Sequence, residues 1–342
     1  MAVINEAQLK EQISKKNFSN AYILFGEESY LKDFYTNQLK KKIIDSAFAD
    51  FNYHEHEGAK ANMDDIAMDT SMLPMMSEYS LVLVNDYPFE DSSDVKKLEE
   101  ILKDLNESSI LVFRYDKISI DVKKSKTFSK VVNLFSKYGT AAELKKRTET
   151  DLINLVLKGA KKRNCSIDKR NAQYFISVVG SDIQTMLNEL EKLCSFIGEG
   201  EITRSIIDEV AVKSLQARIY DLSKFILAKN GEAAYGLLNA LFAQKADEIV
   251  ILAVLSSCYV DMYRAKCAVQ ANVSDSDVSS TFGYRGREFV LRNAKRDSSR
   301  ISINALRNAL DILADADEKL KSTAVSKKVI LEETVAKLLI LR

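Results

Sequence analysis

Residues able to bind phosphate occur together in one short stretch, Ala21–Phe34, which reads AYILFGEESYLKDF. A phosphate-binding loop has the pattern G-x-x-x-x-G-K-[ST] between a strand and a helix, and its lysine and hydroxyl contact phosphate and Mg²⁺. Gly26 and Lys32 fit this pattern, but Leu31 stands at the second glycine and Asp33 at the hydroxyl residue. Leucine fills the space where the backbone should approach phosphate. We therefore expect a degenerate loop that binds no nucleotide and in which Lys32 points to solvent.

Acidic residues and histidines elsewhere form no complete catalytic or metal-binding pattern. Asp86 follows the apolar run Leu81–Val84, where a nucleotide hydrolase places acids, but no catalytic glutamate pairs with it. His54 and His56 alternate along an expected strand and share a face, yet a third and fourth metal ligand are missing, so a solvated edge strand is the favoured explanation. No nucleophile motif such as G-x-S-x-G is present. We predict no catalytic residue, no metal and no cofactor.

An apolar segment with a proline lies between an expected helix and an expected strand. It reads SMLPMMSEYSLVLV, and Pro74 stops the helix ahead of Met75 and Met76, with Met72 and Leu73 beside them. Methionine side chains adapt well to a partner's pocket. Two interpretations remain open: the four apolar residues form a partner-binding surface, or they pack beneath the sheet.

Basic residues gather near the C-terminal end of the chain. Arg292, Lys295, Arg296 and Arg300 have i, i+3, i+4 and i+8 spacing, which predicts that they share one helix face. Such a stripe suits DNA phosphates. A solvated helix face is the more common meaning of any one basic cluster.

Strand and helix signals alternate through about the first 140 residues, which predicts a three-layer α/β domain. Short continuous apolar runs are typical of parallel strands buried on both faces. The predicted strands are Ala21–Phe25, Phe51–Glu55, Leu81–Asn85, Ile110–Tyr115 and Thr140–Leu144, and the predicted helices are Tyr30–Ser46, Asn62–Thr70, Ser92–Leu105 and Ser125–Tyr138. Beyond residue 145 the pattern is helical, with Lys169–Val179 and Ser181–Phe196 as clear helices and no convincing strand after them.

Composition supports a globular chain large enough for two or three domains. The 342 residues are 46% hydrophobic and 29% charged, with no apolar stretch near the roughly 20 residues of a membrane span. The four cysteines are scattered and read as free thiols in a reducing compartment. The first residues form an amphipathic helix pattern and not a signal peptide. We expect a cytoplasmic protein with no membrane partner.

Four stretches, taken in order over some 300 residues, resemble the delta subunit of bacterial DNA polymerase III. They read AYILFGEESYLKDF, LPMMSEYSLVLVND, GSDIQTMLNELEKLCSFIGEGEIT and RNAKRDSSRISINALRNALDILADADEKLKS. In the last of these, Asp317 and Lys321 match the family's Ala-Asp-x-x-x-Lys-Ser pattern. Each stretch is moderately specific, and their order and spacing strengthen the match.

The resemblance implies an α/β plus all-α architecture of the AAA+ type. It comprises a RecA-like three-layer α/β domain with a degenerate phosphate loop (residues 1–145), a small helical lid domain (146–212) and a C-terminal helical collar domain (213–342) that oligomerises in a ring of five subunits. Family members of this kind lack a working ATP site, which agrees with the residues at Leu31 and Asp33. The family is a component of the polymerase holoenzyme, and no residue here supports nucleotidyl transfer by the chain itself.

The resemblance also implies partners and a conformational mechanism. Met75 and Met76, with Leu73 beside them, correspond to apolar residues that enter a pocket of the sliding clamp, the beta subunit. The other implied partners are the gamma/tau and delta prime subunits and primer-template DNA. In the implied mechanism, ATP bound by sister subunits exposes these apolar residues, which form a wedge. The wedge binds the open clamp better than the closed one. The family's arginine pair after Ser-Glu is replaced here by Tyr79-Ser80, which puts a charged contact there in doubt.

Two other functions fit parts of the sequence. An active AAA+ ATPase of another assembly would require ATP binding by this chain alone. A stand-alone DNA-binding module would act through the C-terminal basic residues and show steep salt dependence.

Overall fold

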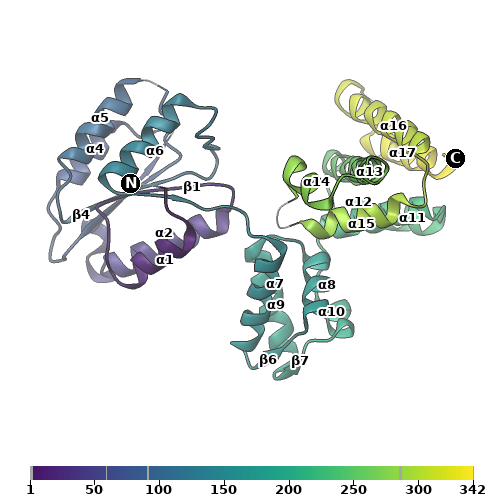
Figure 1. Ribbon diagram of the computed structural model, residues 1–342, viewed down its shortest axis with the longest axis horizontal. Coiled ribbons are helices and arrows are strands. Elements are labelled where there is room, and N and C mark those ends of the chain that lie inside the picture. Colours follow the sequence, from purple (N-terminus) through teal and green to yellow (C-terminus); the bar gives the residue numbers. More distant parts are fainter. Residues whose placement is uncertain (1–2, 59, 91, 285–286, 342) are drawn as a thin grey trace. The chain divides into compact units, whose positions relative to one another are not determined.

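The chain divides into two compact units, Met1–Lys146 and Arg147–Arg342. The computed structural model describes residues 3–58, 60–90, 92–284 and 287–341 (Figure 1). The predicted division into three domains at residues 145 and 212 stays a prediction.

The first unit contains a five-stranded parallel sheet in the order β2-β3-β4-β1-β5. Its strands are β1 (Ala21–Phe25), β2 (Tyr53–Glu57), β3 (Ser80–Asn85), β4 (Ser109–Arg114) and β5 (Thr140–Glu143). All residues of β1 and β3 are buried, as expected for inner strands covered on both faces. The order places β1 beside β4, far from its successor β2. That arrangement brings the turn after β1 close to the turn after β4.

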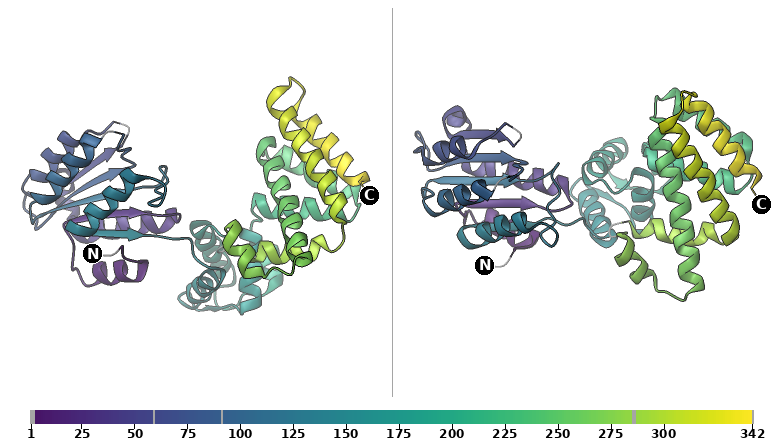
Figure 2. Two further views of the ribbon diagram at one scale, coloured as in Figure 1. Left: turned by 45° about the horizontal axis from the view of Figure 1, so that its top comes forward. Right: turned by 90° about the horizontal axis from the view of Figure 1, so that it is seen from above.

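Helices cover both faces of this sheet and make three layers (Figures 1 and 2). On one face lie α4 (Met63–Ser71), α5 (Ser92–Lys103) and α6 (Lys126–Tyr138), packed on a core that includes Ile23, Val84 and Phe113. On the other lie α1 (Glu6–Ser14) and α2 (Ser29–Ile43), packed on Tyr22, Leu24 and Val112. Alternate residues of each strand thus enter opposite cores, and each fully buried large side chain contributes about 1.5–3 kcal/mol.

Four of the five predicted strands lie within one residue of the observed strands at each end. The strand predicted at Phe51–Glu55 is two residues too early, because the chain first forms the short helices η1 (Ser46–Phe48) and α3 (Ala49–Asn52). This shift places Asn52 on a helix.

The second unit begins with a group of helices and one very short strand pair. Its elements are α7 (Glu149–Lys161), β6 (Cys165–Ser166), α8 (Lys169–Val179), α9 (Ile183–Ile197), β7 (Gly200–Glu201) and α10 (Arg204–Val210). Helix α7 begins with a capping box in which Thr148 and Asp151 are bonded reciprocally. The prediction of no strand after residue 196 is wrong, since β7 pairs in parallel with β6. Two-residue strands carry no apolar period that a sequence pattern could reveal.

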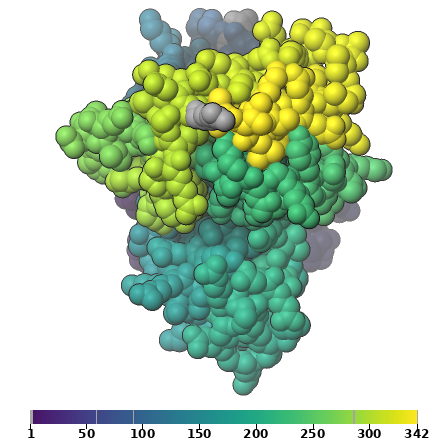
Figure 3. All heavy atoms as spheres, turned by 90° about the vertical axis from the view of Figure 1, so that its right-hand side faces the viewer, coloured from purple at the N-terminus to yellow at the C-terminus, as the bar shows by residue number. Residues whose placement is uncertain are grey.

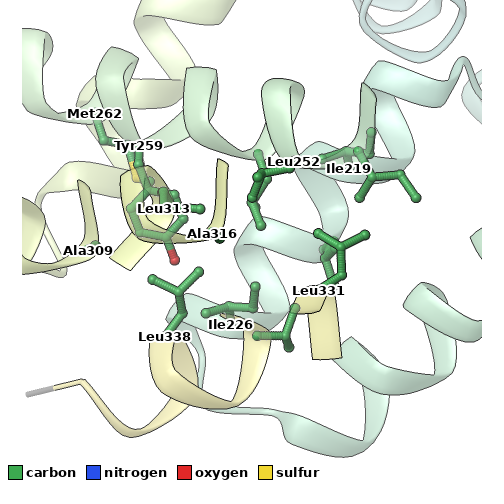
Figure 4. Close-up of a cluster of buried hydrophobic side chains, with 14 of the residues drawn as sticks. Ile219, Ile226, Leu252, Tyr259, Met262, Ala309, Leu313, Ala316, Leu331 and Leu338 are labelled. Carbon is green, nitrogen blue, oxygen red and sulfur yellow. The ribbon is translucent and has the colours of Figure 1, made fainter. Parts of the chain in front are cut away.

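The remaining helices share one apolar core. They are α11 (Leu215–Leu227), α12 (Gly231–Ala243), α13 (Glu248–Gln270), α14 (Asp275–Phe282), α15 (Glu288–Ser298), α16 (Ile303–Ser322) and α17 (Lys327–Ile340). Figure 4 shows Tyr259 of α13, Leu313 of α16 and Leu338 of α17 converging in this core. The space-filling view in Figure 3 shows the C-terminal helices, in yellow, lying against the green helices that precede them. No helix among the described residues is long and apolar enough to cross a membrane.

Candidate functional site

The turn after β1 requires a glycine. Gly26 has a φ of +116°, and a Cβ atom there would lie 2.4 Å from the carbonyl oxygen of Leu144. The approach is close because the amide of Leu144 donates to the carbonyl of Phe25 at 2.7 Å. Gly26 therefore allows the geometry of this strand-to-helix turn.

The prediction that Lys32 points to solvent is wrong. Its side chain is only 3% exposed, and the Nζ atom donates to the carbonyl oxygen of Gly26 at 2.9 Å and lies 3.1 Å from Oδ1 of Asp116. A buried ammonium needs such partners, because desolvation without them is costly. The carbonyl and the carboxylate thus satisfy the amine that a phosphate loop would offer to phosphate.

The neighbouring loop positions are also occupied by contacts within the protein. Asp33 pairs with Arg114 at the end of β4, and the side chain of Leu31 is buried beneath the sheet. A hydrogen bond from Ser29, together with the charge of Lys32, holds the pKa of Asp116 below its usual value. Two ion pairs therefore connect the start of α2 to the end of β4, where Mg²⁺ and phosphate would lie in a nucleotide-binding relative of this fold.

A cleft of about 630 Å³ remains beside this closed loop. Its lining residues include the acids Glu27, Asp116, Asp121 and Glu143 and the bases Lys32, Lys123 and Lys145. The cleft has no excess of positive charge among these side chains, and its most buried amine is already paired. Its chemistry is therefore poorly suited to a triphosphate.

Asp86 holds the backbone of a loop. One of its carboxylate oxygens accepts hydrogen bonds from the amides of Asp116, Lys117 and Ile118 at 2.8, 2.9 and 3.0 Å. These bonds fix the turn that carries Asp116 toward Lys32. Asp86 therefore has a structural role in this loop, which agrees with the sequence, where no catalytic glutamate pairs with it.

The two histidines lie on the same face of β2, which is an edge strand as predicted. Nε2 of His56 is 2.7 Å and Nδ1 of His54 is 3.7 Å from the same carboxylate oxygen of Asp69 on α4. In the part of the chain that the structure describes, no group of three or more potential ligands has the geometry of a metal site. The pair therefore ties β2 to α4.

The segment Met72–Met76, here called the apolar loop, projects its side chains into solvent. Helix α4 ends at Ser71, and Met72 adopts an extended conformation ahead of Pro74. The exposed fractions are 44% for Met72, 77% for Leu73, 52% for Met75 and 79% for Met76. The interpretation that these residues pack beneath the sheet is therefore wrong, and the partner-binding interpretation remains. Four neighbouring exposed apolar side chains are unusual on a folded domain and typical of a binding surface.

Asn52, which the sequence did not single out, holds the apolar loop by its backbone. Its Oδ1 accepts from the amide of Met75 at 2.7 Å, and its Nδ2 donates to the carbonyl of Met75 at 2.9 Å and to Oγ of Ser77 at 3.0 Å. The side chain was placed by the sequence pattern in a strand, so its contact with a loop more than 20 residues later was not foreseen. An asparagine just before a strand, such as Asn52 before β2, gives no sequence signal for a contact with a distant loop.

Tyr79 and Ser80, which stand where the family has an arginine pair, make packing contacts within the first unit. The ring of Tyr79 meets Phe18 edge to face at 6.2 Å, and Ser80 is buried at the start of β3. Neither supplies a charge beside the apolar loop.

The four basic residues predicted to share a helix face do not all lie on one helix. Helix α15 ends at Ser298, and Arg300 lies in the turn beyond it. Arg292 bonds both oxygens of Glu149 at 2.8 and 2.5 Å, which raises the pKa of the arginine. Lys295 and Arg296 also pair with carboxylates, those of Asp275 and Asp297, at 2.9 and 3.0 Å. The prediction of a single basic stripe is therefore wrong, because α15 ends at Ser298, two residues before Arg300.

The fold and the closed phosphate loop define a chain of AAA+ architecture: a RecA-like parallel α/β domain followed by helical regions. Sequence models of two parts of one family match it: "DNA polymerase III, delta subunit" over residues 22–137 and its C-terminal domain over residues 216–338. Together these matches span well over half of the chain. The chain belongs to the DNA polymerase III delta subunit family.

Individual relatives agree with this membership. The chain is 23% identical to DNA polymerase III subunit delta of Bacillus subtilis, covering 96% of this chain and 95% of the relative. It is 20% identical to a probable DNA polymerase III subunit delta of Aquifex aeolicus, covering 87% of each. The solved structure of the Bacillus subtilis DNA clamp loader delta protein is similar in fold, with a TM-score of 0.63 at 21% identity over 97% of this chain and 99% of that one.

Proposed function

We propose that this chain is a clamp-loader subunit that binds the sliding clamp through the apolar loop and opens it, without hydrolysing ATP itself. The observation that carries the proposal is the exposure of Leu73, Met75 and Met76 at the end of α4. The family membership supplies the partner, and the loop supplies a surface of suitable chemistry.

The apolar loop has enough side-chain surface to anchor a partner. Burying a leucine or methionine side chain stabilises a complex by about 1.5–3 kcal/mol before the cost of ordering it. The flexible thioethers of Met75 and Met76 can adapt their shape to a pocket on the clamp. The mostly apolar character of the loop, with no arginine pair beside it, makes shape and burial the main source of affinity.

The proposed mechanism is a shift between clamp conformations. The loop binds the open clamp better than the closed clamp, and the difference in affinity sets how far it moves the equilibrium. ATP held by sister subunits controls when the loop is exposed. The ion pairs of Lys32 and Asp33 support the absence of hydrolysis in this chain, since both groups are committed to protein partners.

The remaining partners follow from the same proposal. The gamma/tau and delta prime subunits contact the C-terminal helices, and primer-template DNA is held by basic residues inside the assembled ring. Arg292, Lys295, Arg296 and Arg300 stay candidates for DNA contact, although the first three already have carboxylate partners. The proposed location is the cytoplasm, and the polymerase reaction belongs to the holoenzyme and not to this chain.

Clamp affinity of Met75→Ala/Met76→Ala tests the proposal. Truncating two central apolar anchors is expected to weaken clamp binding at least about 30-fold, or about 2 kcal/mol, measured by calorimetry or surface plasmon resonance. Phe196→Ala is the control, because Phe196 is similarly exposed at 58% but lies in the second unit. Unchanged clamp affinity in the double variant would show that the wedge is elsewhere.

A further inference from the structure

Asn52 is a polar side chain with no exposed surface, although it lies next to Phe51, which is 59% exposed. It belongs to the four-residue helix α3 and packs toward the segment that follows α4. A fully buried carboxamide is retained only where its donors and acceptor find partners. Here the partners all come from the apolar loop and the residue after it.

The hydrogen bonds of Asn52 form a two-point contact with a single residue. Its oxygen accepts the amide of Met75 and its nitrogen donates to the carbonyl of the same residue. A carboxamide is one of the few side-chain groups with a donor and an acceptor in this arrangement, since aspartate has no donor and the hydroxyl of serine is too short to span both. The contact therefore fixes both the position and the orientation of the Met75 backbone.

The residue after this contact has a backbone conformation that methionine seldom adopts. Met76 has a φ of +52°, in the left-handed region. Such conformations persist where neighbouring contacts determine them, and they concentrate at binding sites. Pro74 restricts the chain before Met75, and Asn52 restricts Met75 itself, so the two together hold Met76 in the conformation that exposes 79% of its side chain.

We propose that Asn52 is the positioning residue of the clamp-binding surface, which it organises before the clamp arrives by fixing the Met75 backbone. This inference rests on the proposed function. A loop already held in its binding conformation loses less conformational entropy on association, so its affinity is higher than that of the same side chains on a mobile loop. Asn52 has no exposed surface with which to touch the clamp and acts through Met75 and Met76.

Amide hydrogen exchange tests the positioning in the free protein. In Asn52→Ala the Met75 amide loses its acceptor, and its exchange is expected to accelerate at least about tenfold. Asn85→Ala is the matched control: Asn85 is 2% exposed and makes two side-chain hydrogen bonds, to Glu55 and Glu57, at the other end of β3. The Met75 amide should exchange at the wild-type rate in that control. Equal protection of Met75 in Asn52→Ala and wild type would overturn the proposal.

A double-mutant cycle with the clamp separates positioning from general destabilisation. The full-length Asn52→Ala protein is expected to bind the clamp about tenfold more weakly than wild type, and Asn85→Ala to bind within about twofold of it. In the Met75→Ala/Met76→Ala background, Asn52→Ala should cause no further loss, because the side chains it positions are gone. An additive loss in that background would contradict a role through the two methionines.

A second substitution covers the case in which Asn52→Ala folds poorly. Asn52→Asp keeps the acceptor for the Met75 amide and removes both donors, so Met75 should exchange at a rate between those of wild type and Asn52→Ala. Exchange as slow as in wild type would show that the contact with the Met75 carbonyl has no role. If Met75→Ala/Met76→Ala leaves clamp binding intact, the proposed function fails, whereas the exchange measurement still decides whether Asn52 holds the loop.

Discussion

The ammonium group of Lys32 finds its polar partners within the protein, whereas the lysine of a phosphate-binding loop finds them on the bound phosphate. The carbonyl of Gly26 and the carboxylate of Asp116 surround an amine that is almost fully buried. The sequence identified Lys32 as part of a degenerate loop but could not identify its partner. Asp116 lies far along the chain, and only the pairing of β1 with β4 brings the two residues together. Substitutions at Leu31 are a poor test of ATP binding, since that side chain is part of the core.

Asp116→Asn is expected to lower the stability of the protein at neutral pH by about 1–2 kcal/mol, because it removes a charge-assisted partner of a buried ammonium. The pKa of Asp116 is lower in the folded protein than its usual value. The stabilisation that Asp116 provides is therefore fully present above about pH 4, which is the pKa of an aspartate in the unfolded chain. It is lost as the pH falls through the lower pKa of Asp116 in the folded protein. Denaturant unfolding of wild type and Asp116→Asn should differ by a constant amount above about pH 5, and the difference should shrink below about pH 4.

Asp33→Asn provides the control for this measurement. Asp33 pairs with Arg114 but is half exposed at 52%, so its loss should change stability by less than about 1 kcal/mol. A difference between wild type and Asp116→Asn that grows toward acid pH would contradict the assignment of Asp116 as an ionised partner of Lys32.

At the scale of elements, the ion pair of Arg292 and Glu149 joins α15 to the first turn of α7. Glu149 is 9% exposed at its side chain, and both of its oxygens are bonded by the guanidinium. A carboxylate in the first turn also interacts favourably with the helix dipole. Arg292, one of the four basic residues that the sequence made candidates for DNA contact, therefore has a structural partner.

Arg292→Ala is expected to destabilise the chain by about 1–2 kcal/mol, since it leaves a mostly buried carboxylate without its bidentate partner. Glu149→Gln should show a coupling energy with Arg292→Ala of similar size in a double-mutant cycle of thermal or denaturant unfolding. Arg300→Ala, in the exposed turn after α15, should change stability by less than about 0.5 kcal/mol. If Arg292→Ala and Arg300→Ala changed the free energy of unfolding equally, the ion pair of Arg292 and Glu149 would contribute nothing to stability.

The elements that the sequence predicted well are those whose own residues determine them. The apolar runs of β1, β3 and β4 are long enough to show burial on both faces. β2 reads YHEHE, a polar edge strand, so its start was placed two residues early. Its true start is set by the helix α3 and the contacts of Asn52 with Met75, which are tertiary and leave no local pattern. The exposure of the apolar loop was likewise undecided in the sequence, because methionines suit a core and a surface pocket equally.

At the scale of the whole molecule, the first unit contains everything that the proposed clamp contact needs. The apolar loop, Asn52 and the cores on both faces of the sheet all lie within Met1–Lys146. Residues 1–146 alone are therefore expected to unfold cooperatively and to bind the clamp within about threefold of the full chain.

Circular dichroism melting and clamp titration of that fragment check this expectation, with residues 147–342 as a control that should not bind the clamp. A folded fragment with no clamp affinity would show that the second unit supplies part of the binding surface.

The exposed thioethers of the apolar loop have a chemical consequence. Peroxide transfers one oxygen atom to a methionine sulfur, and the sulfoxide is polar, whereas Met63, Met186 and Met262 are at most 2% exposed and should resist. Mild peroxide treatment is expected to oxidise the exposed methionines Met68, Met75 and Met76 first, as followed by peptide mass spectrometry, and to lower clamp affinity about tenfold or more through the two in the apolar loop. Methionine sulfoxide reductase should restore it. Under the proposed function, a clamp-binding loop built from methionine would make clamp loading responsive to oxidative stress, because a thioether is oxidised by peroxide and a benzene ring is not.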